Sequence, residues 1–151
     1  GPGICRWPGK IPGGRRTDAG AGNIDLRPTI ARIAGAAAPT DRVLDGRDLW
    51  PLLAGETERS PHPYFHYLGG SAEGQANHRG IRDERWKLVL SVGVDGKVAG
   101  TELYDLGADP GEKFDRAKQH PAIVQRLAAA AQQFHDDLRK NMRPAGRRGR
   151  G

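Results

Sequence analysis

The strongest constraint on the fold is a change of apolar period in the second half of the chain. Short aromatic or aliphatic runs at 64–68, 80–82, 86–90 and 102–106 are separated by turn residues such as Gly-Gly and Asp-Gly. Such runs predict three or four antiparallel strands. From residue 121 the apolar spacing becomes 4, 4, 3 and 4, which is typical of one face of a long helix. The residues of this stripe are Ile123, Leu127, Ala131, Phe134 and Leu138.

The first 55 residues follow a different pattern. Residues 4–7 resemble a strand entered midway, and residues 8–22 are rich in Gly and Pro. Residues 23–34 predict a helix, with Asn23 or Asp25 as its N-cap, and residues 48–53 predict a short apolar turn of helix. A lone strand and helix have no sheet to join within this segment.

Large apolar side chains are scarce, because Leu, Ile, Val and Phe make up only 28 of 151 residues while Gly and Pro make up 33. So thin a core predicts either a loop-rich chain or a chain that completes a core lying elsewhere. The opening Gly-Pro-Gly, without Met, adds to the expectation of a fragment. We divide the chain into residues 1–55, the edge of an α/β domain, residues 56–140, an α+β subdomain with a helix over about 121–140, and residues 141–151, a disordered basic tail.

The net charge of +6 belongs to the end of the chain. Residues 1–138 hold 18 basic and 18 acidic side chains, whereas the last 13 residues hold six basic side chains and no acid. This distribution argues against specific nucleic-acid binding and predicts at most salt-dependent attraction to polyanions. No apolar run approaches the length that spans a bilayer, and the sequence leaves the compartment open.

Five blocks, at residues 2–12, 23–35, 44–53, 82–88 and 102–112, occur in an order that resembles the C-terminal part of the sulfatases, the arylsulfatase-like enzymes of the alkaline phosphatase superfamily. The first block reads Arg-Trp-Pro-Gly, the fourth Arg-Asp-Glu-Arg-Trp-Lys-Leu, and the last Glu-Leu-Tyr-Asp-Leu followed by Asp-Pro-Gly-Glu. The resemblance implies an alkaline phosphatase-like α/β parent. This chain would supply its trailing strand and helix, then a small antiparallel sheet with a C-terminal helix.

The resemblance also implies that the parent hydrolyses sulfate esters of small molecules or polysaccharides. Sulfatases use calcium and a formylglycine formed from cysteine, and a hard cation on oxygen ligands suits a tetrahedral anion. The family's nucleophile motif, metal carboxylates and catalytic Lys and His precede the block where this chain begins, so we expect no catalytic residue and no metal ligand here. We expect the chain alone to be inactive, and we expect the family's members to be commonly exported.

Several residues imitate a site. Cys5 has Pro at its third following position rather than the second, so we interpret it as a buried small hydrophobe and not as the formylglycine precursor. His62 and His66 have zinc-like spacing, but Pro61 and Pro63 oppose a helix there, so we do not predict a metal site. Asp25 is interpreted as a helix cap.

The polar, glycine-rich segment 66–78 is the one place where we expect contact with substrate. The resemblance implies that it faces the active-site mouth as one wall of the pocket, and its hydrogen-bonding residues are Glu73, Gln75, Asn77 and His78. Two alternatives stay open: a phosphoester or phosphonate hydrolase of the same superfamily, or a non-catalytic module that holds sulfated polysaccharide through this loop and the basic tail.

Overall fold

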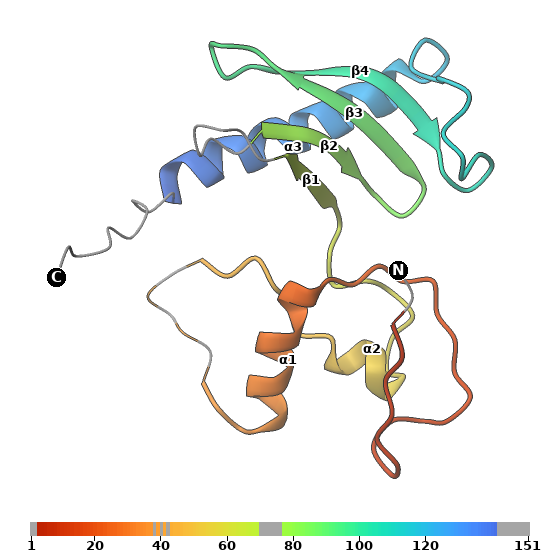
Figure 1. Cartoon of the computed structure of the whole chain (residues 1–151), viewed down its shortest axis with the longest axis vertical. Helices are drawn as coiled ribbons and strands as arrows, with labels where there is room; N and C mark the ends of the chain where they lie inside the picture. The colour runs from red at the N-terminus through yellow and green to blue at the C-terminus, as the bar shows by residue number, and fades with distance from the viewer. Residues whose placement is uncertain (1–2, 38, 40, 42, 70–76, 142–151) are drawn as a thin grey trace, which may run out of the picture. The chain divides into compact units, whose positions relative to one another are not determined.

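A computed structural model describes residues 3–37, 39, 41, 43–69 and 77–141 (Figure 1). The chain divides into two compact units, Gly1–Pro63 and Tyr64–Gly151. The predicted basic tail lies outside the described residues except for Asn141, which ends the last helix.

The first unit contains a 3-10 turn, η1 (Asn23–Asp25), and two short helices, α1 (Leu26–Ile33) and α2 (Trp50–Ala54). Both predicted helices are confirmed. Gly35 and Gly55 follow them with φ values of 67° and 83°, a left-handed conformation that ends a helix and that glycine adopts without strain.

The strand predicted over residues 4–7 is wrong for this chain. The segment is irregular, and Cys5, expected to be buried, is exposed. The physical reason is that an extended segment needs a neighbouring strand for its backbone hydrogen bonds, and the described residues of this unit supply none.

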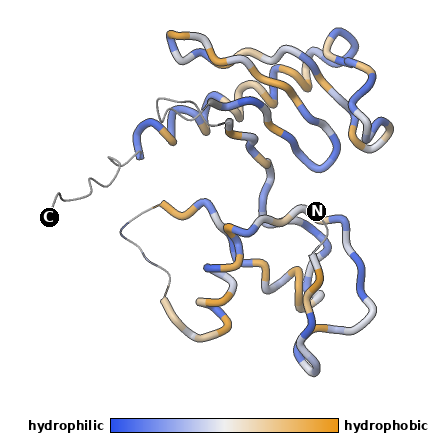
Figure 2. The backbone as a smooth tube through the Cα atoms, in the orientation of Figure 1, coloured by the Kyte–Doolittle hydropathy of each residue, from blue (hydrophilic) through white to orange (hydrophobic). Residues whose placement is uncertain are grey.

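The second unit contains a four-stranded antiparallel sheet, which confirms the prediction of three or four antiparallel strands, and its strand order is β1-β2-β3-β4. Its strands are β1 (Phe65–Gly69), β2 (Asn77–Arg82), β3 (Trp86–Val92) and β4 (Val98–Asp105). Strand β2 begins three residues earlier than expected and β1 extends to Gly69, so both ends of the segment predicted as a loop belong to strands. In Figure 2 the turn between β2 and β3 is hydrophilic, in keeping with a solvent-exposed turn.

Helix α3 (Pro121–Asn141) packs on one face of the sheet and confirms the apolar stripe (Figure 1). Its Leu127 and Ala131 are fully buried against Ile81, Leu88 and Leu103. A sheet with only one face on a helix alternates more and less buried positions, and along β3 the buried Leu88 and Leu90 alternate with the half-buried Val89 and the exposed Ser91.

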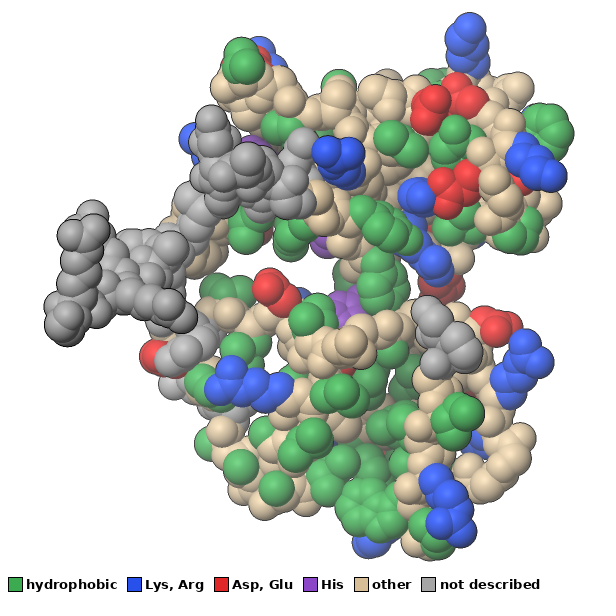
Figure 3. Space-filling model, in the orientation of Figure 1, with side chains coloured by type: hydrophobic (Ala, Val, Ile, Leu, Met, Phe, Trp, Pro, Cys, Tyr) green, Lys and Arg blue, Asp and Glu red, His purple; other side chains and the backbone are tan. Residues whose placement is uncertain are grey.

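The apolar side of α1 is exposed within its own unit. Leu26 is 51% and Ile30 is 61% exposed, and hydrophobic side chains are visible on the surface of this unit (Figure 3). Apolar side chains that recur on one face of a helix usually cover a core, and this unit offers too little core to cover them.

Candidate functional site

Two histidines, one in β1 and one in β2, are the first and last residues of the 66–78 segment. His66 of β1 and His78 of β2 form a ring-to-ring hydrogen bond of 3.1 Å between Nδ1 and Nε2. Phe134 of α3 stacks on His66 at 3.7 Å and meets the edge of His78 at 5.4 Å. Because one of the two facing nitrogens must carry the proton and the other accept it, the contact requires that the rings are not both doubly protonated.

The environment of the pair favours neutral imidazole. Burial lowers the pKa of His66 to about 4, and the nearby His78 adds to the effect. Burial also lowers the pKa of His78; the backbone of Gly80 opposes this, and His135 adds to it. The Nδ1 atoms of His78 and His135 are buried and accept or donate no hydrogen bond in the structure. The lowered pKa values of His66 and His78 favour the neutral form of both rings at pH 7, and the two rings anchor the strand ends in that form.

The four residues predicted to contact substrate differ in where they lie in the structure. Glu73 and Gln75 lie outside the described residues. Asn77 is the first residue of β2, opposite Gly69 of β1. His78 is only 1% exposed, so the side chain that the sequence suggested for substrate contact instead supports the base of this segment.

The polar residues of the fourth and fifth blocks engage each other. The Arg85 guanidinium donates to both carboxylate oxygens of Asp105 at 2.9 and 2.6 Å, and this hydrogen bonding, the leading effect, holds the pKa of Asp105 below its usual range. Lys87 donates to both oxygens of Glu112 at 2.7 and 2.6 Å. These ion pairs connect the end of β4 and the loop after it to the start of β3. The charged residues of the two blocks therefore stabilise the fold.

Asp83, in the turn between β2 and β3, also stabilises the fold through hydrogen bonds. It accepts hydrogen bonds from the backbone N–H groups of Arg85 and Trp86, and from the side chain of Arg126 on α3. Burial opposes ionisation of Asp83, but these hydrogen bonds outweigh it, and its pKa is lowered. One carboxylate therefore connects a turn of the sheet to the helix that covers it.

In the first unit, Asp25 is a tertiary hub rather than the simple cap that the sequence suggested. Its fully buried carboxylate accepts from the backbone N–H of Gly22 and of Arg47, each at 2.7 Å, and contacts Nε2 of His62 at 2.7 Å. His62 thus faces a carboxylate 37 positions earlier in the chain, which no local spacing could indicate. The contacts explain why an acidic residue is tolerated without solvent.

The described residues do not fit a resident metal. Within them, no group of three or more His, Cys, Asp or Glu side chains is arranged to hold a cation. His62 and His66, the pair with zinc-like spacing, face different partners. In the described part of the chain no helix is both long and apolar enough to cross a bilayer.

The second unit is a four-stranded antiparallel sheet covered by one helix, and ion pairs between the fourth and fifth sequence blocks hold it together. The chain belongs to the family described as N-sulphoglucosamine sulphohydrolase, C-terminal, whose members it matches over residues 1–140. The resemblance and the alkaline phosphatase-like fold class inferred from the sequence are thereby confirmed.

Relatives of known name support the same assignment. The chain is 35% identical to human steryl-sulfatase over 97% of its own length and 27% of that protein. It is 39% identical to human arylsulfatase D over 91% of its length and 28% of that protein. The chain therefore spans little more than a quarter of the length of these relatives.

Two solved structures show the same fold. The structure of BT4656 in complex with its substrate D-glucosamine-2-N,6-O-disulfate has a TM-score of 0.62 and 26% identity, covering 92% of this chain and 29% of that one. Ps i-CgsB in complex with k-i-k-neocarrahexaose has a TM-score of 0.69 and 27% identity, over 92% and 29% of the two chains.

Proposed function

We propose that this chain is the C-terminal part of a sulfuric ester hydrolase, and that it completes the fold and one wall of the substrate pocket. The observation that carries the proposal is the family match over residues 1–140, in which the matching blocks are also the segments that hold the subdomain together. The exposed apolar side of α1 supports the same role, since a helix with such a face completes a core when a further layer covers it.

The chemistry of such an enzyme requires groups that the described residues do not provide. Calcium and formylglycine would supply, respectively, charge stabilisation at the sulfate oxygens and the nucleophile. No described cluster fits the cation, and Cys5 lacks the nucleophile motif. We assign both to the parent enzyme outside this chain.

The contribution of this chain would be to bind and orient the ester. Glu73 and Gln75 lie in the sequence between β1 and β2, Asn77 begins β2, and all three residue types can hydrogen-bond a sulfated sugar. The His66–His78 pair and Phe134 fix the two strand ends between which this segment runs. Positioning a substrate on a rigid base lowers the entropic cost of binding it, so we expect this segment to influence which ester is hydrolysed. Two solved relatives are described as complexes with sulfated or carrageenan-type sugars, which supports a saccharide substrate.

Two assays test the proposal. The purified 151-residue chain is incubated with 4-nitrophenyl sulfate and calcium, and we expect no turnover. In a complete sulfatase carrying this chain as its C-terminal part, Gln75→Ala and Asn77→Ala should change kcat/KM by about 10-fold for some sulfate esters and little for others. The matched control is Gln133→Ala, on an exposed position of α3, which should leave all values unchanged.

Turnover by the isolated chain that disappears in Cys5→Ser would overturn the assignment of the nucleophile. Equal kcat/KM values for the loop variants and the Gln133→Ala control, across several esters, would remove the loop from the substrate pocket.

A further inference from the structure

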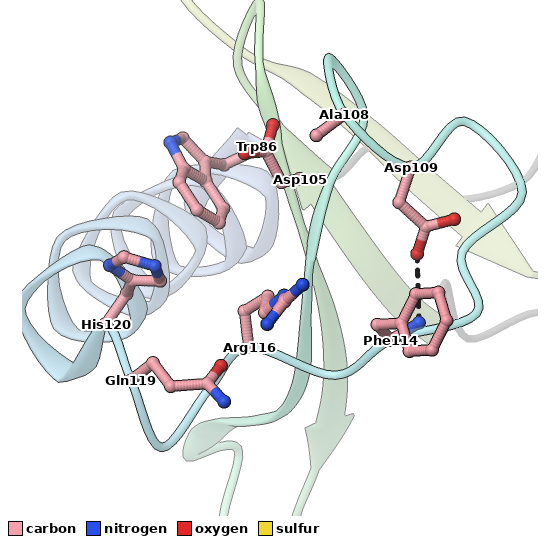
Figure 4. Close-up of a pocket in the computed structure, with 8 residues that line it drawn as sticks. All are labelled: Trp86, Asp105, Ala108, Asp109, Phe114, Arg116, Gln119 and His120. Carbon is pink, nitrogen blue, oxygen red and sulfur yellow. Dashed lines mark hydrogen bonds between the residues drawn. The ribbon is translucent and has the colours of Figure 1, made fainter.

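A concave site lies at the end of the sheet where β4 leads into α3. It is a pocket of about 480 Å³ between β3 and the loop after β4, within the second unit (Figure 4). The polar and aromatic side chains that line the pocket and could contact a ligand include Trp86, Asp105, Asp109, Arg116, Gln119 and His120. A volume of this order suits a small molecule or one unit of a polymer.

The charges of the pocket leave one cation available. Asp105 accepts hydrogen bonds from Nε and Nη2 of Arg85, one on each carboxylate oxygen. One carboxylate oxygen of Asp109 accepts from the backbone N–H groups of Lys113 and Phe114, at 2.7 and 2.9 Å, so its other oxygen is the acceptor that remains for a ligand hydroxyl. Arg116, in contrast, forms no ion pair with any carboxylate of the described residues.

The Arg116 side chain is placed by a short turn. Its backbone N–H donates to the carbonyl of Leu103 at 2.7 Å, and its own carbonyl accepts from the N–H groups of Gln119 and His120, each at 3.1 Å. This turn presents Arg116, Gln119 and His120 on the same side of the loop (Figure 4). The guanidinium carbon lies 5.9 Å from the centre of the Phe114 ring, a cation–π contact that does not neutralise its charge.

Aromatic rings form another wall. The ring centres of Trp86 and His120 are 4.8 Å apart, with an angle of 57° between the planes. Half-buried tryptophan offers an apolar surface with a polar edge, a combination that suits the alternating apolar and hydroxyl faces of a sugar ring. A guanidinium supplies several directed donors for a sulfate or carboxylate oxygen.

We propose that this pocket binds a saccharide unit bearing a sulfate or carboxylate group, with the anionic group on Arg116, hydroxyls on Asp109 and Gln119, and the ring against Trp86. None of its lining residues belongs to β1 or β2. The pocket would hold a further unit of an anionic polysaccharide while hydrolysis proceeds elsewhere. Binding here does not depend on the proposed hydrolysis, because the ligand chemistry follows from the pocket itself.

The test is a titration of the ¹⁵N-labelled 151-residue chain by nuclear magnetic resonance. The probes are N-acetylglucosamine 6-sulfate, glucuronate, unsubstituted N-acetylglucosamine and inorganic sulfate. We expect the 6-sulfate or glucuronate to shift the Trp86 indole and backbone signals of residues 105–120, with a Kd of about 1 mM, and the other two probes to bind at least about 10-fold more weakly.

Arg116→Gln should weaken binding of the anionic sugar by about 10-fold or more, because it removes the charge and keeps a polar side chain. The matched control is Lys118→Gln, an exposed cation two positions along that does not line the pocket, and it should bind as the parent chain does. The spectrum of each variant verifies that it folds.

The proposal is overturned if the shifts map away from residues 86 and 105–120. It is also overturned if neutral sugar or inorganic sulfate binds as tightly as the anionic sugars, or if Arg116→Gln and Lys118→Gln behave alike. Loss of 4-nitrophenyl sulfate hydrolysis in a complete enzyme would not affect this outcome, so failure of the proposed function and failure of this site are distinguishable.

Discussion

The His66–His78 contact makes the second unit sensitive to acid. The pKa of His66 is lowered from 6.5 to about 4 in the folded chain, first by burial and then by His78. A folded-state pKa below the unfolded value means that the unfolded chain binds more protons between these two pH values. Stability should therefore be fully present above pH 6.5 and fall progressively as the pH falls from 6.5 to about 4.

The expected size of the effect follows from the same values. A pKa change from 6.5 to about 4 corresponds to at most about 3 kcal/mol of unfolding free energy for one group. Because the ring is only partly buried, solvent screening reduces the expected loss to about 1–2 kcal/mol. Two nearby titratable groups add to the effect of burial: His78 lowers the pKa of His66, and His135 lowers the pKa of His78. The lowered pKa values of Asp83 and Asp105 place the loss of their carboxylate contributions at the acid end of the titration.

Urea unfolding followed by circular dichroism at pH 7, 6, 5 and 4 measures this loss, and the histidine Cε1 signals in NMR spectra give the pKa of His66 directly. His66→Gln removes the titrating ring and should flatten the dependence between pH 6.5 and 4. The control His120→Gln removes an exposed imidazole and should retain the slope. A His66 pKa near 6.5 in the folded chain, or equal slopes for His66→Gln and the parent, would refute the reasoning.

Four further substitutions or measurements test the fold. Asp105→Asn should lower the melting temperature, because it discharges the partner of Arg85, and a double-mutant cycle with Arg85→Met should show non-additivity; additive effects would contradict a working ion pair. Asp25→Asn should cost about 1–3 kcal/mol in urea unfolding, because the amide cannot accept all three contacts of the buried carboxylate; an unchanged midpoint would exclude the hub. Gly100→Ala should cost about 1–3 kcal/mol, since its Cβ would lie 2.9 to 3.1 Å from side chains of β3 and α3, and a melting temperature equal to that of the parent would show that this interface yields. Cys5, which is exposed, should react with a thiol reagent without denaturant, and protection until urea is added would show that it is buried.

The sequence predicted the elements because their signals are local. The helical stripe of α3 and the short runs of the sheet each lie within a few residues, and period and turn chemistry are properties of neighbouring positions. The error at residues 4–7 has the complementary cause: an apolar run reads as a strand, but a strand exists only where another strand pairs with it.

The candidate site was less accessible to prediction. His78 was singled out as a polar residue in a loop, yet pairing with Leu68 places it in β2, where it is buried against His66 and Phe134. The apolar stripe that contained Phe134 was a usable signal, because a sheet residue facing that stripe must pack on it. What could not be inferred was the register of β1 on β2, with its irregularity between Tyr67 and Leu68, that brings the His66 and His78 rings into contact.

By itself the sequence determined the family, the helices, the strands of the second unit and the blocks that carry the fold, because each rests on residues close together in the chain. Only the tertiary structure decided what the polar residues in those blocks do. Arg85 meets Asp105 across 20 positions and His62 meets Asp25 across 37. It also left Arg116 without an acidic partner in the described residues beside an aromatic wall. Charges that pair stabilise the fold, whereas Arg116, the unpaired cation of the pocket, can bind a ligand, and this distinction depends on distances that only folding sets.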